Sequence, residues 1–445
     1  MTLVLRNVRL WGGEAVDVGV AAGRIAAIGL HLSCARNEID GRGDLLLPGL
    51  HDHHLHILAL GARRLSVDLT GLVDAGAVRT ALARAPSHGG WLRAVGYDER
   101  AAGLPDRALL DRWVADRPLR LQDRTGALWV LNSRAMDQLA VRDLPPGTER
   151  DASGSPTGRF WRENQWLAVA LPRSAPDLAP LGKELAELGL TALTDATAHN
   201  GPAEARLLAG AMAQRLTLMG DEALTVGEGY ALGPLKLLID ERDPPDIDAL
   251  AARIAGARAQ ERTVAAHCVT EVELALFLAA LATAGGARTG DRIEHGGMIA
   301  EQALGVIAEA GLTVVTNPAF IHDRGDRYRA TIAQALWGDL YRARSLLAAG
   351  IPVMAGSDAP YANVDPWLGM RAARDRMTAQ GMRLAPNERL DALAALHLYT
   401  ARPIGCGMPA DLVLCSGSLR EVLGDLTADR VRAVVIAGDP VFIRD

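Results

Sequence analysis

Lysine, cysteine and aromatic residues are scarce in this sequence, and positive charge is not in excess. The four cysteines lie far apart without CxxC spacing, so neither a disulfide framework nor a thiolate zinc site is indicated. The formal net charge of −6 at pH 7 argues against a nucleic-acid or anionic membrane surface, because both need a basic patch. No apolar run reaches membrane-spanning length, and the N-terminus lacks the layout of a signal peptide. We therefore expect a cytoplasmic globular protein with no nucleic-acid or membrane partner.

The scarcity of lysine singles out the two lysines that remain. Among 47 lysine and arginine residues, only Lys183 and Lys236 are lysines. The chain therefore uses arginine for almost every ordinary surface cation. Because an amine and a guanidinium differ chemically, each retained lysine is a candidate for a position where arginine cannot substitute.

The 445 residues suffice for one large barrel domain and a small second domain. Short strands are predicted near both ends of the chain, over 2–10, 16–28, 410–414 and 431–436. Strand-rich ends around a middle of strands and helices indicate a small sheet domain built from both termini. We assign residues 1–46 and 405–445 to this sheet domain and residues 47–404 to the barrel.

Between the ends, short apolar strands alternate with helices rich in alanine, leucine and arginine, which is the pattern of a parallel sheet with βα units. We predict an α/β fold, a (β/α)8 TIM-like barrel. An insertion around 60–118 contains a further strand at 92–97, and the loop-like segment around 143–165 is expected to cap the barrel mouth. The barrel strands are expected near residues 45–56, 119–124, 190–195, 234–240, 263–268, 291–296, 312–318 and 352–358.

The first barrel strand carries the most informative motif. An apolar run is followed by Pro48-Gly49 and then by His54 and His56, two imidazoles at positions i and i+2. Strand side chains alternate between two faces, so both imidazoles point the same way. Neutral imidazole is a common ligand of zinc and related ions, and the pair therefore predicts two ligands of one metal.

Four later strands also end in residues that can bind metal or move protons. Catalytic residues of a (β/α)8 barrel gather at the C-terminal ends of its strands. A lone histidine there is more often a core residue, and a lone Asp before Ala-Pro is more often a turn residue. Their order along the chain reverses that expectation. The four residues are Lys236, His267, His295 and Asp358.

The motif Pro48-Gly49-x-x-Asp52-x-His54-x-His56 resembles the first-strand motif of the amidohydrolase superfamily. The resemblance implies a β-sandwich beside the barrel and a centre of two divalent metal ions. Zinc is the first choice for the metals, and iron or manganese would also fit the ligand set. In this family the lysine is carboxylated and bridges the metals, which implies His54, His56, Lys236 and Asp358 as ligands of the first metal and Lys236, His267 and His295 as ligands of the second.

The same resemblance implies hydrolysis of a C–N bond in a small molecule, which is an amide, a formamide or a cyclic amide. A metal-bridging hydroxide would attack the carbonyl, and Asp358 would shuttle a proton to the leaving nitrogen. The chain looks closest to N-substituted formamide deformylases, through stretches such as 154–158, 189–195 and 292–295. It departs from that branch at 125–127 and at 240–241, in regions expected to face the substrate or to connect elements.

Two other interpretations stay open. Mononuclear deaminases of aminated rings resemble one another in a His-x-x-Glu motif, but the third residue after His267 is Thr270, and Glu271 comes one position later. A non-catalytic metal-bound barrel would have no need of a proton shuttle at Asp358. The oligomeric state cannot be derived from the sequence, and a homodimer is one assembly we consider.

Several further residues are weaker candidates. His199 and His322 follow barrel strands, and they join Arg124 and Trp161 as candidates for substrate binding, because functional residues concentrate on loops. Asp195 is either a strand-end cap or a group that supports the site. Cys268 is expected to pack in the core as a small apolar residue, and His51 and His53 are expected to pack or to support the ligands rather than bind metal.

Overall fold

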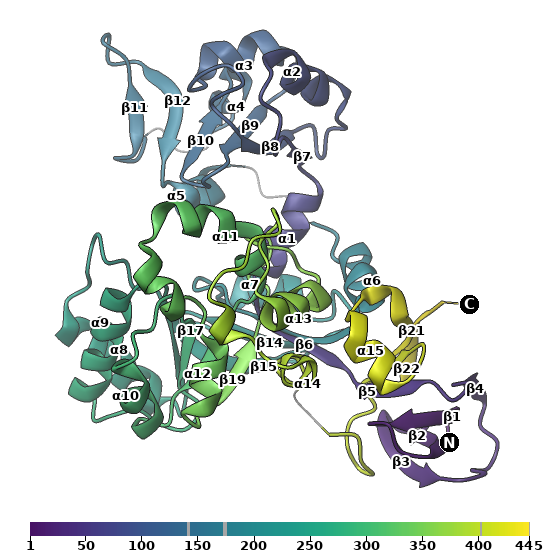
Figure 1. The fold of residues 1–445 in the computed structure, drawn as a ribbon. Coiled ribbons are helices and arrows are strands. Elements are labelled where there is room, and N and C mark those ends of the chain that lie inside the picture. The colour runs from purple at the N-terminus through teal and green to yellow at the C-terminus, as the bar shows by residue number, and fades with distance from the viewer. Residues whose placement is uncertain (140–142, 172–175, 401–402, 445) are drawn as a thin grey trace. The chain divides into compact units, whose positions relative to one another are not determined.

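The computed structural model describes residues 1–445 except 140–142, 172–175, 401–402 and 445 (Figure 1). The chain forms two compact units. One contains Met1–Ile57 and Leu178–Asp445, and the other contains Leu58–Asp177. Among the described residues, no helix combines the length and apolar character needed to cross a bilayer.

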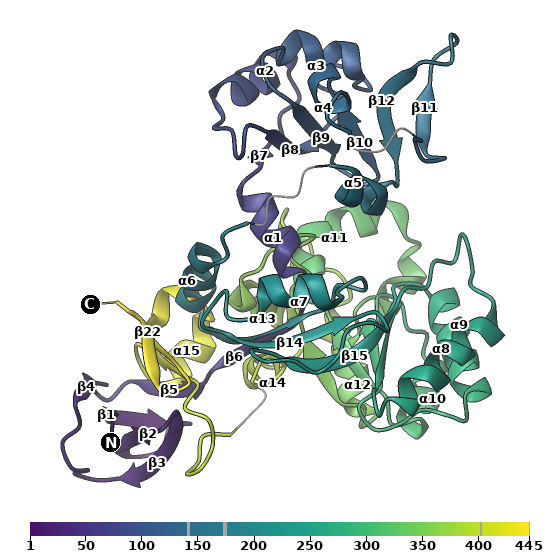
Figure 2. The ribbon, with the colours of Figure 1, turned by 180° about the vertical axis from the view of Figure 1, so that it is seen from behind.

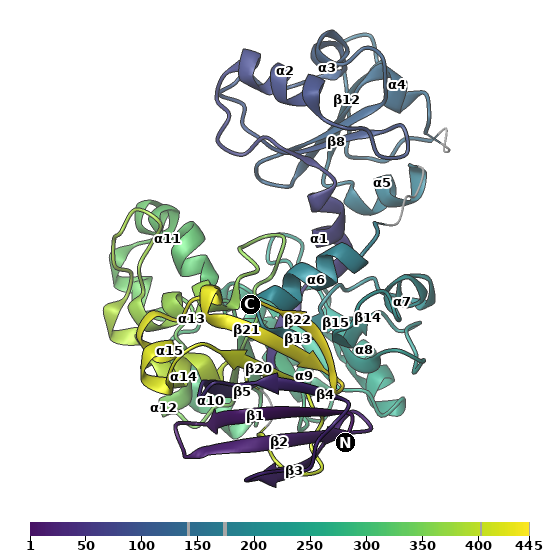
Figure 3. The ribbon, with the colours of Figure 1, turned by 90° about the vertical axis from the view of Figure 1, so that its right-hand side faces the viewer.

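Strands from both ends of the chain form one sheet, as the sequence predicted (Figure 3). Along the sheet, the C-terminal strands join the N-terminal ones through β5, which pairs antiparallel with β20 and parallel with β1. Strand β4 pairs with the first half of β1. Apolar side chains such as Leu5, Val18 and Leu412 form its core. The strands are β1 (Leu3–Leu10), β2 (Ala15–Ala21), β3 (Arg24–Gly29), β4 (Asn37–Asp40), β5 (Leu45–Pro48), β20 (Leu412–Cys415), β21 (Val431–Ile436) and β22 (Asp439–Ile443).

The larger part of this unit is a nearly closed barrel of eight parallel strands in the order β19-β18-β17-β16-β15-β14-β13-β6 (Figure 2). Backbone hydrogen bonds close the gap between β6 and the segment after β19: Asp358 N donates to His54 O at 2.7 Å, and His56 N donates to Ala359 O at 2.8 Å. The predicted barrel is confirmed. Its strands are β6 (Leu50–Leu55), β13 (Leu190–Asp195), β14 (Arg215–Gly220), β15 (Ala231–Leu237), β16 (Val264–Cys268), β17 (Arg292–His295), β18 (Thr313–Thr316) and β19 (Val353–Ala355).

Helices between the strands cover the outside of the barrel, as α8, α9 and α10 show in Figure 2. Some of them begin at a residue whose side chain caps the helix; Asp246, for example, accepts a hydrogen bond from the Ala249 N–H at the start of α8. The helices of this unit are α6 (Ala179–Glu187), α7 (Pro202–Leu208), α8 (Ile247–Ala259), α9 (Glu271–Thr283), α10 (Ala303–Glu309), α11 (Ala319–Thr331), α12 (Ala343–Ala348), α13 (Pro366–Asp375), α14 (Ala392–His397) and α15 (Leu419–Asp425).

One predicted barrel strand is wrong. The segment 119–124 corresponds to β9, which lies in a separate sheet, and its barrel position belongs to β14, which pairs with β13 and β15. Strand β9 alternates buried and half-buried residues, whereas the barrel strand β13 is buried almost throughout. Strands covered on both faces need that near-continuous apolar character, and β9 lacks it.

The second unit is an insertion with its own six-stranded sheet, ordered β11-β12-β10-β9-β8-β7. It is longer than the segment 60–118 predicted for it, and the loop-like segment 143–165 contains the antiparallel pair β11 and β12. The expected role of this segment as a cap stays a prediction. The elements are β7 (Val67–Asp68), β8 (Leu92–Tyr97), β9 (Leu119–Asp123), β10 (Leu128–Leu131), β11 (Thr148–Arg150), β12 (Pro156–Trp161), α2 (Ala75–Arg84), α3 (Arg107–Trp113), α4 (Ser133–Met136) and α5 (Asn164–Ala170), while α1 (Ile57–Arg64) begins at the unit boundary.

Candidate metal centre

The two histidines of β6 stand at the C-terminal end of the barrel. His54 is buried and His56 is partly buried, with their rings 5.6 Å apart between centroids. Each ring is held from behind through Nδ1: that of His54 lies 2.5 Å from Glu294 Oε2, and that of His56 lies 2.9 Å from Thr197 Oγ1. Both Nε2 atoms face Asp358, with that of His56 3.1 Å from its Oδ1.

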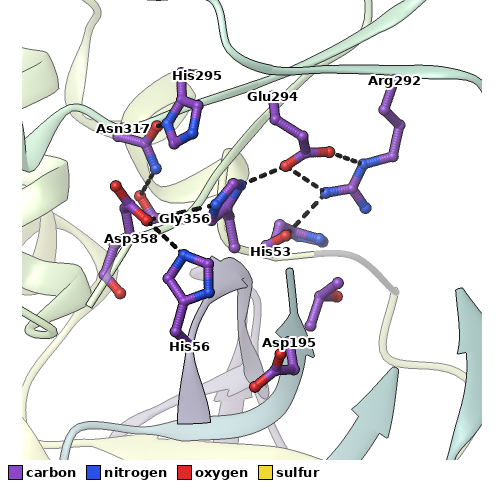
Figure 4. A network of polar contacts seen from close by, with 12 residues as sticks. His53, His56, Asp195, Arg292, Glu294, His295, Asn317, Gly356 and Asp358 are labelled. Carbon is purple, nitrogen blue, oxygen red and sulfur yellow. Dashed lines mark hydrogen bonds and ion pairs between the residues drawn. The ribbon is translucent and has the colours of Figure 1, made fainter. Parts of the chain in front are cut away.

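His295 and Asp358 reach the same place from the ends of β17 and β19 (Figure 4). Both have positive φ, +71° for His295 and +58° for Asp358, a conformation that is strained for residues with side chains. The Nδ1 of His295 lies 2.8 Å from Asn317 Oδ1. Possible ligand atoms of His54, His295 and Asp358 all lie within 4.8 Å of one another, close enough to share one metal ion.

Asp358 is ionised at this position. Burial would raise the pKa of its carboxyl group, but the neighbouring imidazoles of His54 and His56 hold the pKa well below its usual range. Burial and nearby Lys236 disfavour a charge on His54, but the carboxylates of Glu294 and Asp358 outweigh them and raise its pKa. The protein therefore favours a positive charge between His54 and Asp358, where a metal ion would supply one.

His267, at the end of β16, lies beside His295, with ring centroids 4.5 Å apart. Burial lowers the pKa of His267 to about 4, and burial followed by the charges of His267 and His54 lowers that of His295 well below its usual range. Both imidazoles are therefore neutral near pH 7, which is the form that binds metal.

Lys236 lies inside β15 and is fully enclosed, with 2% of its surface exposed. Its Nζ makes no hydrogen bond to any described residue. Burial lowers the pKa of the amine, although the carboxylates of Glu294 and Asp358 oppose that effect. A buried polar atom without a partner is costly, so the site lacks a group that this lysine would bind.

The residues present fit a metal centre. The Nε2 of His54 also makes no hydrogen bond within the described part of the chain, and it faces Asp358 Oδ1 at 3.5 Å. Two buried nitrogen atoms, Nε2 of His54 and Nζ of Lys236, thus make no hydrogen bond to a described residue, and the carboxylates of Glu294 and Asp358 act on the pKa of both groups. Nitrogen and oxygen donors of this kind suit zinc, iron or manganese.

Glu294 is a component of the site that we did not predict. It is fully buried, and it accepts hydrogen bonds from Arg292 through both oxygens, from Nε at 2.7 Å and from Nη2 at 3.2 Å (Figure 4). Strand alternation predicts that neighbours Glu294 and His295 point to opposite faces. The positive φ of His295 breaks that alternation, so both residues contact His54. The sequence signal was the acidic residue directly before a candidate ligand and two positions after Arg292 in the same short strand.

Asp52 is another buried carboxylate that supports the site. Its Oδ1 accepts hydrogen bonds from the backbone N–H groups of His54 at 3.1 Å and Ser357 at 3.0 Å. It therefore joins β6 to the segment that carries Asp358. Burial raises its pKa to about 6.

Other predicted residues have structural partners. Asp195 is a strand-end cap, since its carboxylate accepts hydrogen bonds from the backbone N–H groups of Ile57 and Thr197. Cys268 is buried in the core. The rings of His51 and His53 stack at 3.8 Å between centroids, and His51 Nε2 lies 2.9 Å from Thr194 Oγ1.

The four candidates for substrate binding are divided between the two units. His199 is exposed after β13, and His322 lies on α11 with Nδ1 2.9 Å from Asp323. Arg124 and Trp161 belong to the insertion unit, where Arg124 contacts Glu99 and Trp161 donates to Glu149. Their role with substrate stays a prediction. Tyr361 was missed: its ring lies 5.6 Å from that of His56 and is 54% exposed.

Comparison with known proteins supports the class of enzyme that this site suggests. The chain matches the profile of the amidohydrolase family over residues 37–442. It is 24% identical to a Bacillus subtilis (strain 168) protein named as an amidohydrolase, YtcJ, over 91% of this chain and 86% of that protein. It is 26% identical to the N-substituted formamide deformylase of Arthrobacter pascens, over 90% of this chain and 87% of that enzyme. Among solved structures, an uncharacterised metal-dependent hydrolase from Pyrococcus horikoshii OT3 matches with a TM-score of 0.77 at 19% identity, covering 92% of this chain and 96% of that one.

The chain belongs to the amidohydrolase family. It is a metal-dependent hydrolase that acts on carbon–nitrogen bonds. The resemblance stated from the sequence is therefore confirmed at the level of family, fold and enzyme class.

Proposed function

We propose that this protein hydrolyses the C–N bond of a small amide, formamide or cyclic amide at a centre of two divalent metal ions. The observation that carries the proposal is the convergence of His54, His295 and Asp358 beside a buried lysine whose amine makes no hydrogen bond to a described residue. Such a set gathers at the C-terminal end of barrel strands, where barrel enzymes place their chemistry. A cytoplasmic location and a small-molecule substrate belong to the same proposal.

His54, His56, Lys236 and Asp358 would hold one metal ion, and Lys236, His267 and His295 the other. When bound, the ions would polarise the substrate carbonyl and activate a water molecule as the nucleophile. This pairing divides His295 from His54 and Asp358, although the three lie close enough to share one ion.

Lys236 would act after it is carboxylated. Its neutral nitrogen would attack the carbon of carbon dioxide and lose a proton, which forms a C–N bond and leaves an anionic carbamate with two oxygen donors. Burial lowers the pKa of the amine and so favours the neutral, reactive form. A guanidinium could not take this role, which agrees with a lysine here in a chain that otherwise uses arginine.

Asp358 would move the proton. Its ionised carboxylate would accept a proton as the water oxygen bonds to the carbonyl carbon, and then donate it to the leaving nitrogen as the C–N bond breaks. The hydrogen bond with His56 Nε2 holds its Oδ1 on the side of the candidate metals, where His54 Nε2 lies 3.5 Å away.

The acyl and amine parts of the substrate are open within this class. Similarity to the formamide deformylase favours an N-substituted formamide. Tyr361 is the exposed aromatic side chain beside His56, so we include it among the residues that would contact the amine substituent.

The test is turnover of metal-loaded protein with a panel of N-substituted formamides, other N-acyl amines, cyclic amides and aminated rings, together with metal analysis. We expect two metals per chain and cleavage of a formamide or amide. A fully loaded, active protein with one metal per chain would refute the binuclear centre, and release of ammonia from an aminated ring alone would refute the amide substrate.

One observation favours a second candidate, a single-metal deaminase. His54, His295 and Asp358 can share one ion without Lys236. Against it, Thr270 begins helix α9 as its N-cap and Glu271 is exposed, so neither offers the glutamate of the deaminase motif. The ring substrates in the panel and the metal count together distinguish the two candidates.

A further inference from the structure

Three of the candidate ligand histidines differ in the partner that their Nδ1 atom contacts. The Nδ1 of His56 faces a threonine hydroxyl, and that of His295 faces an asparagine amide oxygen. The Nδ1 of His54 faces a carboxylate, that of Glu294, at 2.5 Å. Of these three contacts, that of His54 alone is made to an anion.

The carboxylate of Glu294 is itself fixed. Glu294 is 0% exposed, and Arg292 binds both of its oxygens. Arg292 Nη2 also donates to the backbone oxygen of His53 at 2.9 Å, which ties the guanidinium to the strand that carries His54. A buried carboxylate needs such a partner, because an unpaired charge in the interior of a protein is strongly destabilising.

We propose that Glu294 and Arg292 are positioning residues that hold His54 as its Nδ1–H tautomer and make the metal position at His54 and Asp358 the tighter of the two. An ionised carboxylate can only accept, so Nδ1 must donate and the lone pair of Nε2 points to Asp358. A carboxylate partner also makes the imidazole a stronger donor to metal, whereas the hydroxyl behind His56 and the amide oxygen behind His295 do this less.

The inference rests on the proposed binuclear function, and a purely structural role is its main competitor. Arg292 and Glu294 could simply join β17 to β6. In that case, breaking the pair would lower the stability of the fold but would leave the affinity of correctly folded protein for metal unchanged.

The experiment is a titration of metal-free protein with cobalt(II) and zinc(II) against a chromophoric chelator, with the visible absorption of bound cobalt as a second readout. We expect two binding steps in the natural protein. Glu294→Gln keeps the size of the side chain but removes its charge. It should weaken the tighter step by about 10–100-fold, as supporting partners of metal ligands do, and change the weaker step by no more than about twofold.

Asp291→Asn is the matched control. Asp291 is equally buried just before β17 and pairs with Arg258 at 2.7 Å, but it lies away from the histidines. This variant should lower the unfolding midpoint and leave both metal affinities and the cobalt spectrum unchanged. Where Glu294→Gln does not fold, the double variant Arg292→Met/Glu294→Met replaces the pair by apolar side chains, a change that buried ion pairs often tolerate, and it should show the same selective loss.

The inference would be overturned if folded Glu294→Gln bound metal in both steps with the same affinities as the natural protein. It would also be overturned if the variant lost affinity equally in both steps. A single binding step in the natural protein would refute the binuclear function instead. The inference about Glu294 would then be judged on that one constant, which should still weaken by about 10–100-fold.

Discussion

Two buried ion pairs have their carboxylates at strand β17, Asp291 just before the strand and Glu294 within it. The two pairs lie toward different ends of the barrel. Asp291, before the strand, binds Arg258 and also accepts hydrogen bonds from the backbone N–H groups of Val264 and Arg288. Glu294, within the strand, binds the side chain of Arg292 and also contacts the side chain of His54.

The difference separates stability from function. Apart from Arg258, the partners of Asp291 are backbone N–H groups, so its contacts hold the local fold. Those of Glu294 continue through His54 to an Nε2 that makes no hydrogen bond to a described residue. Buried charge therefore supports the fold at the N-terminal end of β17 and supports the candidate site at its C-terminal end.

The largest effect expected at the C-terminal end is that of Lys236→Ala. It removes the proposed bridging ligand, so the protein should lose at least one metal per chain and most of its turnover. Short carboxylates such as acetate should restore part of both. Metal analysis and turnover check this, with Lys183→Ala as control, since that exposed lysine on α6 should be replaceable without effect. Two metals and normal turnover in Lys236→Ala would contradict the carbamate.

Asp358→Asn should separate metal binding from proton transfer. The amide keeps the shape of the side chain and one oxygen ligand but cannot accept the proton. We expect turnover to fall by about 10²–10⁴-fold while most of the metal stays bound. Metal content and kcat measured on the same preparation test this. Near-normal turnover at full occupancy would remove Asp358 from the mechanism.

Candidate ligands could be predicted from the sequence near the C-terminal ends of parallel strands, and the structure brings His54, His295 and Asp358 together there. Their role as metal ligands stays a prediction. Membership of the sheets could not be predicted in the same way. Both β9 and β14 are short strands that pair with the strands next to them in the chain, so local sequence does not show which sheet each one joins. Glu294 could not be assigned, because its contact with His54 depends on the left-handed backbone at His295.

Asp291→Asn should affect the stability of the fold, because Asp291 belongs to the ion pair at the N-terminal end of β17. The new amide group would face the Arg258 guanidinium or a backbone N–H that needs an acceptor. Removing one partner of a buried pair costs about 3–5 kcal/mol, and we expect the lower end because the asparagine oxygen still accepts. Denaturant unfolding of the metal-free protein measures the loss. Unchanged stability would contradict a structural role for this pair.

The smallest expected effect tests whether every contact near the candidate centre is functional. Thr270 follows His267 by three residues and caps helix α9: its Oγ1 accepts from the Glu273 N–H, and Glu273 accepts from the N–H groups of Val269 and Thr270. Thr270→Ala removes one cap contact and should cost about 1 kcal/mol of unfolding free energy. Metal content and turnover should not change, because Thr270 supplies no ligand and Glu273 still holds the backbone after β16. Thr270→Ser keeps the hydroxyl and should restore stability. A loss of metal or turnover in Thr270→Ala without loss of stability would show that this position, where the deaminases have their glutamate, takes part in the chemistry.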